Sequence, residues 1–167
     1  MNQSFTTERL MMEPVRIEDA EFIIELVNTE GWLQFIGDRH VHSKEAAVIY
    51  IEKLRSTPAL TYWVVRLRDD KLPLGIISFL KRANLEHFDI GFAFLPQYQG
   101  QGYAYEAARK VLSVVSEHPE HHTILATTLA NNTSSIRLLE RLGFGLDREM
   151  QEGDKRILIF SNARNGS

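Results

Sequence analysis

An alternating strand that runs into a glycine-rich loop and then a helix is the feature that most constrains this chain. Residues 88–95 (FDIGFAFL) place large apolar side chains at every second position, which would give a strand one large apolar face and one smaller face. Residues 96–102 (PQYQGQG) form the loop, and apolar residues with helical spacing follow up to Val115. A strand and a helix joined so closely pack against each other, which predicts a layered α/β domain.

The rest of the chain carries both helical and strand patterns. Helical spacing covers residues 18–29, 43–56 and 132–142, with Ser43 as an N-cap and Gly143 as the closing glycine. Strand patterns cover residues 8–13, 61–67, 74–80, 123–129, 144–150 and 155–161. We expect a single-domain α/β fold with a mixed, mostly antiparallel sheet of about six to seven strands, flanked by about four helices.

Length and hydropathy set the organisation of the chain. A chain of 167 residues suggests one domain. We expect it to span residues 1–167, with a core over about 6–160 and a short frayed tail at 161–167. No stretch approaches the roughly 20 apolar residues of a membrane span. Residues 1–9 lack the apolar core of a signal peptide, so we expect a cytoplasmic protein with no membrane partner.

Charge and cysteine content exclude several classes of function. The chain has 19 Lys and Arg residues against 22 Asp and Glu residues, a net charge of −3. Such a balance offers no basic excess for a phosphate backbone, so we expect no nucleic-acid partner. Cysteine is absent, which excludes disulfides, cysteine nucleophiles, thiolate zinc sites and iron–sulfur clusters.

The loop before the long helix has the character of a phosphate site. Backbone N–H groups at a helix start are unpaired and lie at the positive end of the helix dipole. Gly100 and Gly102 would let this backbone approach an anion closely. The GxxxxGK[ST] phosphate loop is absent, and the dinucleotide pattern GxGxxG has Tyr105 in place of its third glycine. A Rossmann-like nucleotide-binding protein is therefore disfavoured.

Two motifs, in order, resemble those of one enzyme family. Residues 99–104 (QGQGYA) resemble the Q/R-x-x-G-x-G/A loop of the GCN5-related N-acetyltransferases (GNAT). Residues 132–144 (NTSSIRLLERLGF) are similar to the N-x-x-S-x-x-L-x-E-K-x-G-F motif of the RimJ/RimL-like ribosomal-protein alanine acetyltransferase branch. Residues 7–10 (TERL) and 31–39 (GWLQFIGDR) also fit that branch. The resemblance spans about residues 6–160 and implies a GNAT-like fold.

The resemblance implies the cofactor and the reaction. Acetyl-CoA would be the co-substrate, and its acetyl group would pass directly to a primary amine of a protein N-terminus or a small molecule. Gln101 stands where Lys or Arg is common, so Arg109 and Lys110 would supply positive charge, unless they are only solvated helix charges. A backbone N–H aimed at the acetyl carbonyl would contribute roughly 3 kcal/mol. The implied cofactor-binding residues are Phe94, Leu95, Gln99, Gly100, Gln101, Gly102, Tyr103, Ala104 and Asn132.

The catalytic residues are less tightly specified. Ser135 occupies the position of the family's general acid, although a serine hydroxyl is far less acidic than a thiol, so we expect it to donate a hydrogen bond to the departing sulfur. Tyr103 and Tyr105 are alternative donors, and a capping role for Ser135 is equally open. Asp89 is the candidate base, acting through water beside small neighbours, with a solvated strand carboxylate as the alternative. Glu86 and His87 are further candidates for the base.

Other clusters predict no metal site. His118, His121 and His122 surround a proline without ordered ligand spacing, which favours a solvated loop. His40 and His42 are open between substrate contact and an ordinary loop. The aromatic residues Trp32 and Phe35 would belong to the core or wall the acceptor pocket. A non-catalytic CoA-binding domain remains the alternative to an enzyme, and a homodimer is left open.

Overall fold

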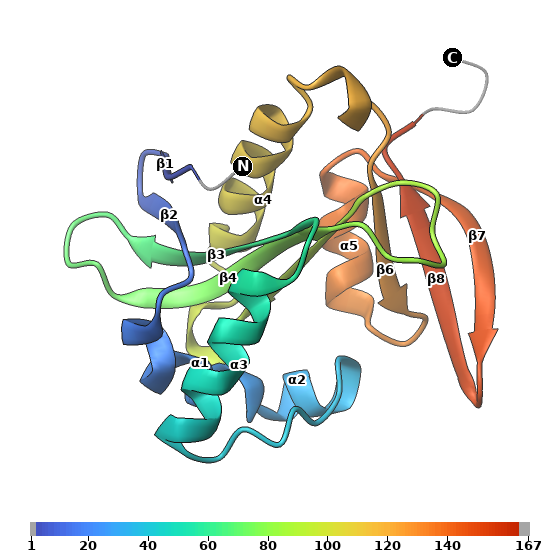
Figure 1. Ribbon diagram of the computed structural model, residues 1–167. Coiled ribbons are helices and arrows are strands. Elements are labelled where there is room, and N and C mark those ends of the chain that lie inside the picture. Colours follow the sequence, from blue (N-terminus) through green and yellow to red (C-terminus); the bar gives the residue numbers. More distant parts are fainter. Residues whose placement is uncertain (1–2, 164–167) are drawn as a thin grey trace.

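The computed structural model describes residues 3–163 and is built on one eight-stranded sheet (Figure 1). Its order is β1-β2-β3-β4-β5-β6-β8-β7, and every neighbouring pair is antiparallel except β5 and β6. The strands are β1 (Phe5–Thr6), β2 (Leu10–Pro14), β3 (Leu60–Leu67), β4 (Pro73–Leu80), β5 (Asp89–Phe94), β6 (Leu125–Leu129), β7 (Gly145–Glu152) and β8 (Lys155–Ser161).

Five α-helices cover the sheet within residues 3–163. They are α1 (Ala20–Val27), α2 (Glu30–Phe35), α3 (Lys44–Ser56), α4 (Tyr103–Val115) and α5 (Thr133–Arg141). The short 3-10 turns are η1 (Ile17–Asp19), η2 (Pro96–Tyr98) and η3 (Pro119–His121). None of these helices has both the length and the hydrophobicity to cross a membrane.

The layered α/β fold is confirmed, and the element counts are corrected upward. The sheet gains β1, and α2 adds a helix to the expected set. Ser43 caps α3 by accepting a hydrogen bond from Ala46 N at 3.1 Å, as predicted. Gly143 follows α5 with φ +94°, the left-handed conformation expected of a closing glycine.

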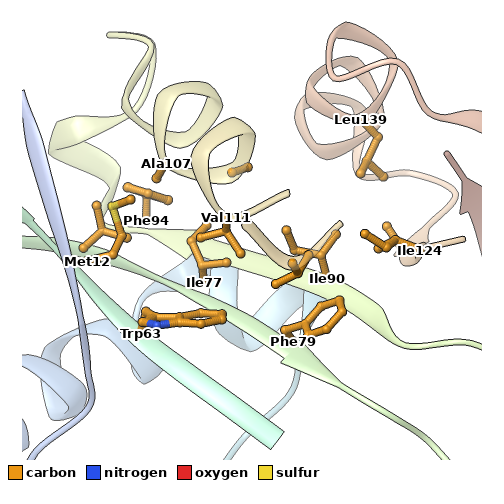
Figure 2. Close-up of a cluster of buried hydrophobic side chains, with 14 of the residues drawn as sticks. Met12, Trp63, Ile77, Phe79, Ile90, Phe94, Ala107, Val111, Ile124 and Leu139 are labelled. Carbon is orange, nitrogen blue, oxygen red and sulfur yellow. The ribbon is translucent and has the colours of Figure 1, made fainter. Parts of the chain in front are cut away.

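The two faces of the sheet carry separate hydrophobic cores. Helices α4 and α5 lie on one face, where Ala107, Val111 and Leu139 belong to one buried cluster with Trp63 and Phe79 of the sheet (Figure 2). Helices α1, α2 and α3 cover the opposite face (Figure 1). Strand β5 contributes to both cores, because large apolar side chains at its even positions face α4 and small ones face α3. The predicted alternation along this strand is therefore confirmed.

Strands β5 and β6 separate soon after they meet. Within residues 3–163 they pair at a single register position, Asp89 with Leu125, and Leu125 N donates to Phe88 O at 2.9 Å. Both strands then run in the same direction toward their carboxyl ends. A gap in the hydrogen-bonding ladder thus opens in the middle of the sheet, beside the end of β5.

The end of the chain is more ordered than predicted up to residue 163. Ser161 completes β8, and Asn162 Oδ1 accepts from Ile124 N at 2.7 Å. Ser161 Oγ accepts from Ala163 N at 3.0 Å. The remainder of the predicted tail, residues 164–167, lies outside the described residues.

Candidate functional site

The loop after β5 holds two glycines in the left-handed region. Gly100 has φ +77° and Gly102 has φ +83°, conformations that L side chains rarely adopt. Gly102 is the N-cap of α4, and no side chain within residues 3–163 caps this helix end. A Cβ added at Gly100 would meet nothing within 4 Å, so this part of the loop faces open space. The loop therefore presents bare backbone toward solvent.

The first amides of α4 are available to an anion. The earliest amide of this helix that finds a backbone carbonyl in the described chain is that of Glu106, which donates to Gly102 O at 3.0 Å. The amides from Gly100 to Tyr105 precede it at the positive end of the helix dipole. Gly100, Gln101, Gly102, Tyr103 and Ala104 form the loop that we call the cradle, and its contact with a phosphate stays a prediction.

Gln99 fastens this loop to the end of the strand. Its Nε2 donates to Phe94 O at 3.0 Å, and its backbone N donates to Pro96 O at 3.2 Å. The side chain thereby fixes the turn from which the glycines start. Gln99 therefore holds the cradle in its conformation through these two hydrogen bonds, and its predicted contact with the cofactor stays a prediction.

The backbone of Leu95 is already paired. Its N–H donates to Leu74 O at 2.9 Å, and its carbonyl accepts from Tyr98 N at 3.0 Å. Backbone groups of neighbouring strand residues point to opposite edges. Since Leu95 points toward β4, Phe94 points toward β6, where the ladder has opened. This leaves the Phe94 N–H as the candidate donor to an extended ligand, since the Leu95 N–H is already bonded to Leu74 O. The predicted contact of Leu95 with the cofactor stays a prediction.

Asn132 and Ser135 mark the start of α5. Asn132 Oδ1 accepts from Ser135 N at 3.3 Å and from Ser134 Oγ at 3.3 Å, so Asn132 is the N-cap of this helix. The cap uses the backbone of Ser135 and leaves its half-buried hydroxyl outside this bond. The Asn132 Nδ2 group is likewise outside the cap. The two polar groups that the sequence singled out can therefore face a ligand without unfolding the helix end.

Parallel strands bring these two motifs to the same edge of the sheet. The cradle follows the carboxyl end of β5, and Asn132 follows the carboxyl end of β6. Ligands of α/β sheets commonly bind outside such carboxyl ends. The open stretch of the ladder lies between the two motifs, so we take this edge, from the cradle to Ser135, as the candidate site.

Asp89 lies at the other end of β5. It occupies the position where β5 and β6 are paired, and five residues of extended strand, roughly 17 Å, separate it from Phe94. Its side chain is 2% exposed, and Arg82 Nε donates to its Oδ1 at 3.0 Å. Burial raises the pKa of Asp89, and the Arg82 charge and hydrogen bond partly oppose this rise. The solvated strand carboxylate expected as the alternative is therefore replaced by a buried carboxylate that pairs with the partly exposed Arg82.

Arg9 contacts the cradle directly, although its place in the sequence indicates no such role. Its Nη1 donates to Gln101 O at 3.1 Å, and its guanidinium lies 4.4 Å from the Tyr103 ring centroid. Arg9 Nε also pairs with Glu106 Oε1 at 2.7 Å, and the Thr7 hydroxyl donates to the same carboxylate. Burial would raise the pKa of Glu106, but these hydrogen bonds and the Arg9 charge lower it. The sequence signal for this contact is the motif of residues 7–10, which by itself does not show what Arg9 touches.

A basic groove of about 630 Å³ adjoins the cradle. Arg109 and Lys110 line it, as does Arg141 of α5, whose guanidinium lies 4.1 Å from the Tyr105 ring centroid. Its one carboxylate, Glu106, is paired with Arg9. The groove therefore carries a surplus of positive charge beside the amides of the cradle. The remaining lining residues are Thr7, Gln101, Gly102 and Ser113.

The other candidates are dispersed. Glu86 is exposed and pairs with Arg148 Nη2 at 2.9 Å. The hydrogen bonds that Arg148 donates to this carboxylate lower the pKa of Glu86. His121 is buried against Phe79 and Phe88, so the predicted solvated loop holds only for its exposed neighbours His118 and His122.

The family model for the acetyltransferase (GNAT) domain matches residues 9–145. The N-acetyltransferase YnaD of Bacillus subtilis (strain 168), itself uncharacterized, is 30% identical over 138 residues, which cover 83% of this chain and 80% of YnaD. This chain belongs to the GNAT acetyltransferase family. It is accordingly an acyltransferase by family, as the resemblance implied.

Solved structures share the fold of this GNAT enzyme. RimL, the ribosomal L7/L12 alpha-N-protein acetyltransferase in complex with coenzyme A, superposes with a TM-score of 0.83 at 14% identity, covering 95% of this chain and 97% of RimL. Spermidine N-acetyltransferase from Vibrio cholerae, in complex with CoA and spermine, gives a TM-score of 0.77 at 16% identity, covering 93% of this chain and 95% of that one. RimL-type enzymes are thus among the structural neighbours.

Proposed function

We propose that this GNAT enzyme transfers the acetyl group of acetyl-CoA directly to a primary amine, either a protein N-terminus or a small molecule. The observation that carries the proposal is the run of open amides from Gly100 to Ala104 beside a basic groove. Amides at a helix start suit a diphosphate, and the cations suit the further phosphate of the CoA headgroup. The fold neighbours RimL and spermidine N-acetyltransferase were solved with coenzyme A, which agrees with this choice.

The open edge of β5 would receive the arm of the carrier. A pantetheine chain contains amides and can hydrogen-bond along a strand edge as another strand would. The Phe94 N–H is directed at this edge, where it can donate to the arm or to the acetyl carbonyl. Asn132 Nδ2 would hold the arm from the opposite side, at the start of α5.

The chemistry needs no acyl-enzyme, in keeping with a chain that lacks cysteine. The amine nitrogen attacks the thioester carbon, the carbonyl becomes an oxyanion, and the carbon–sulfur bond then breaks to release the CoA thiolate. Ser135 would donate a hydrogen bond to this sulfur. The amine would lose a proton to water, and a chain of waters would have to carry that proton to Asp89 at the far end of β5. An α-amine has a pKa of about 8 and is partly neutral near pH 7, so its reaction requires only a weak proton acceptor.

Substitution of Gly100 tests the phosphate cradle. Gly100→Asp places a charged side chain in the open space of the loop. We expect acetyl-CoA affinity to fall by at least about 100-fold, because the carboxylate would repel the diphosphate and the side chain would block its approach to the amides. Gly153→Asp is a matched control, since Gly153 has φ +62°, also meets nothing within 4 Å, and lies in the β7–β8 turn. Calorimetry with CoA and thiol release with acetyl-CoA measure binding and turnover.

Thiol release should be measured with several amine acceptors, including spermidine and a short peptide with a free N-terminus. CoA affinity that is equal in the two glycine variants would overturn the placement of the diphosphate. Tight CoA binding without thiol release on any amine would instead favour a domain that only binds CoA.

A further inference from the structure

The loop between α2 and α3 gathers three side chains of metal-ligand type. Asp38, His40 and His42 each offer one ligand atom, these atoms all lie within 4.8 Å of one another, and all three residues are exposed. In the part of the chain from residue 3 to 163, no other three His, Cys, Asp or Glu side chains are grouped in this way. The cluster lies on the helical layer opposite α4, and none of its three residues lines the basic groove.

The backbone beneath these ligands is held in place. Val41, between the two histidines, is buried in the core under α3, and its carbonyl accepts from Asn28 Nδ2 at 2.7 Å. His40 adopts φ +55°, and its N–H donates to Asp38 Oδ1 at 2.8 Å. Ser43 then begins α3 as its cap. Because the loop is anchored between and after the histidines, the three ligands project from a fixed segment.

The donor set indicates the class of metal. Two imidazoles and one carboxylate suit a borderline transition-metal ion, and Mg²⁺ prefers oxygen ligands alone. Three protein ligands with water in the fourth position are a common arrangement for Zn²⁺. Ligand atoms about 2.1 Å from a tetrahedral ion lie about 3.4 Å from one another. Exposed side chains have the freedom to close from their present spacing to that distance.

Arg39 is the cation within the cluster segment, and its charge would oppose a metal ion. Its guanidinium lies 5.9 Å from the centroid of the Trp32 ring, which turns it back toward α2. We propose that Asp38, His40 and His42 form a surface site for one Zn²⁺ ion. The site uses none of the residues assigned to acetyl transfer, and metal binding is expected to stabilise the segment that joins α2 to α3.

Calorimetric titration of the full chain, without a histidine tag, tests this site with ZnCl₂ and with MgCl₂. We expect one Zn²⁺ per chain and no heat from Mg²⁺. His40→Ala with His42→Ala should lower the Zn²⁺ affinity by at least about 100-fold, since even indirect partners of a metal site change affinity by about 10- to 100-fold. Asp38→Asn keeps the oxygen that accepts from His40 N but removes the charge, so a smaller loss is expected.

The matched control removes two other exposed histidines. His118→Ala with His122→Ala deletes the same number of imidazoles from the η3 region and should leave Zn²⁺ binding unchanged. Absent binding in the unaltered chain, or binding that survives the loss of His40 and His42, would overturn the proposal. A loss of binding in the His118 and His122 variant would also overturn it, because the ion would then bind elsewhere.

Discussion

At the scale of the residue, substitution of Ser135 can distinguish a role in catalysis from a role in capping α5. The cap of α5 runs from Asn132 Oδ1 to the Ser135 N–H, which alanine retains. We therefore expect Ser135→Ala to leave the melting temperature and the acetyl-CoA KM nearly unchanged. We expect kcat to fall by about 10²-fold, the lower end of the range for the loss of one positioned hydrogen-bond donor. Steady-state kinetics with acetyl-CoA and a fixed amine measure this division.

The neighbouring serine is the control for that experiment. Ser134 Oγ donates to Asn132 Oδ1 and is exposed, so Ser134→Ala removes a hydroxyl from the same helical turn without touching the proposed donor. Its kcat should match that of the unaltered enzyme. Equal losses of kcat and CoA affinity in Ser135→Ala would identify a structural residue.

Asp89 can be tested through the direction of its pKa. A base must be ionised, so kcat at saturating amine should fall as the pH drops through the pKa of Asp89, which burial raises above its ordinary 3.8. Asp89→Asn should remove this acid limb. Arg82→Gln withdraws the charge that partly opposes the rise, so the pKa should rise further and the limb should move to higher pH.

A purely structural Asp89 gives a different result in the same experiment. The ion pair with Arg82 would then affect the melting temperature alone, and all three pH profiles of kcat would coincide. A structural role agrees with the position of Asp89 at the paired end of β5, roughly 17 Å along the strand from Phe94.

At the scale of the element, the sequence predicted whatever has a repeating pattern. The alternation in residues 88–95 and the helical spacing in residues 43–56 both come from side chains that must reach one buried face. A two-residue strand such as β1 has no period to detect. Helix α2 spans six residues, begins at a Thr29 cap and buries Trp32, which left too short a pattern to recognise.

The candidate site was predictable where its parts are contiguous in the chain. The cradle and the Asn132 cap are local motifs, so their residues identified them. Arg9 reaches Gln101 across 92 positions of the sequence, and Arg141 meets Tyr105 across two helices. Likewise, only the register of β4 and β5 reveals that the Leu95 amide is already paired. Long-range pairing of this kind leaves no mark in a single sequence.

At the scale of the whole molecule, charge is unevenly distributed. The chain carries a net charge of −3, yet Arg9, Arg109, Lys110 and Arg141 converge on one groove. An anionic carrier would therefore be repelled weakly by the molecule at large and attracted by the groove. Such attraction between exposed charges is screened by salt, whereas hydrogen bonds to the amides of the cradle are screened much less.

Neutralising the groove should accordingly weaken CoA binding and its response to salt. We expect Arg109→Gln with Lys110→Gln to lower CoA affinity by roughly 10-fold at low ionic strength, because each exposed ion pair contributes up to about 1 kcal/mol. The difference should shrink as salt is added. Binding of S-acetyl-pantetheine, which lacks the phosphates of CoA, should be unchanged.

The control for net charge lies on the opposite layer. Lys53→Gln with Arg55→Gln removes the same two charges from the exposed last turn of α3, far from the groove in sequence and across the sheet. If the groove acts locally, this variant retains both the affinity and the salt dependence of the unaltered enzyme. If instead the two double variants lose affinity equally, the overall charge of the molecule governs CoA binding, and the groove has no special part in it.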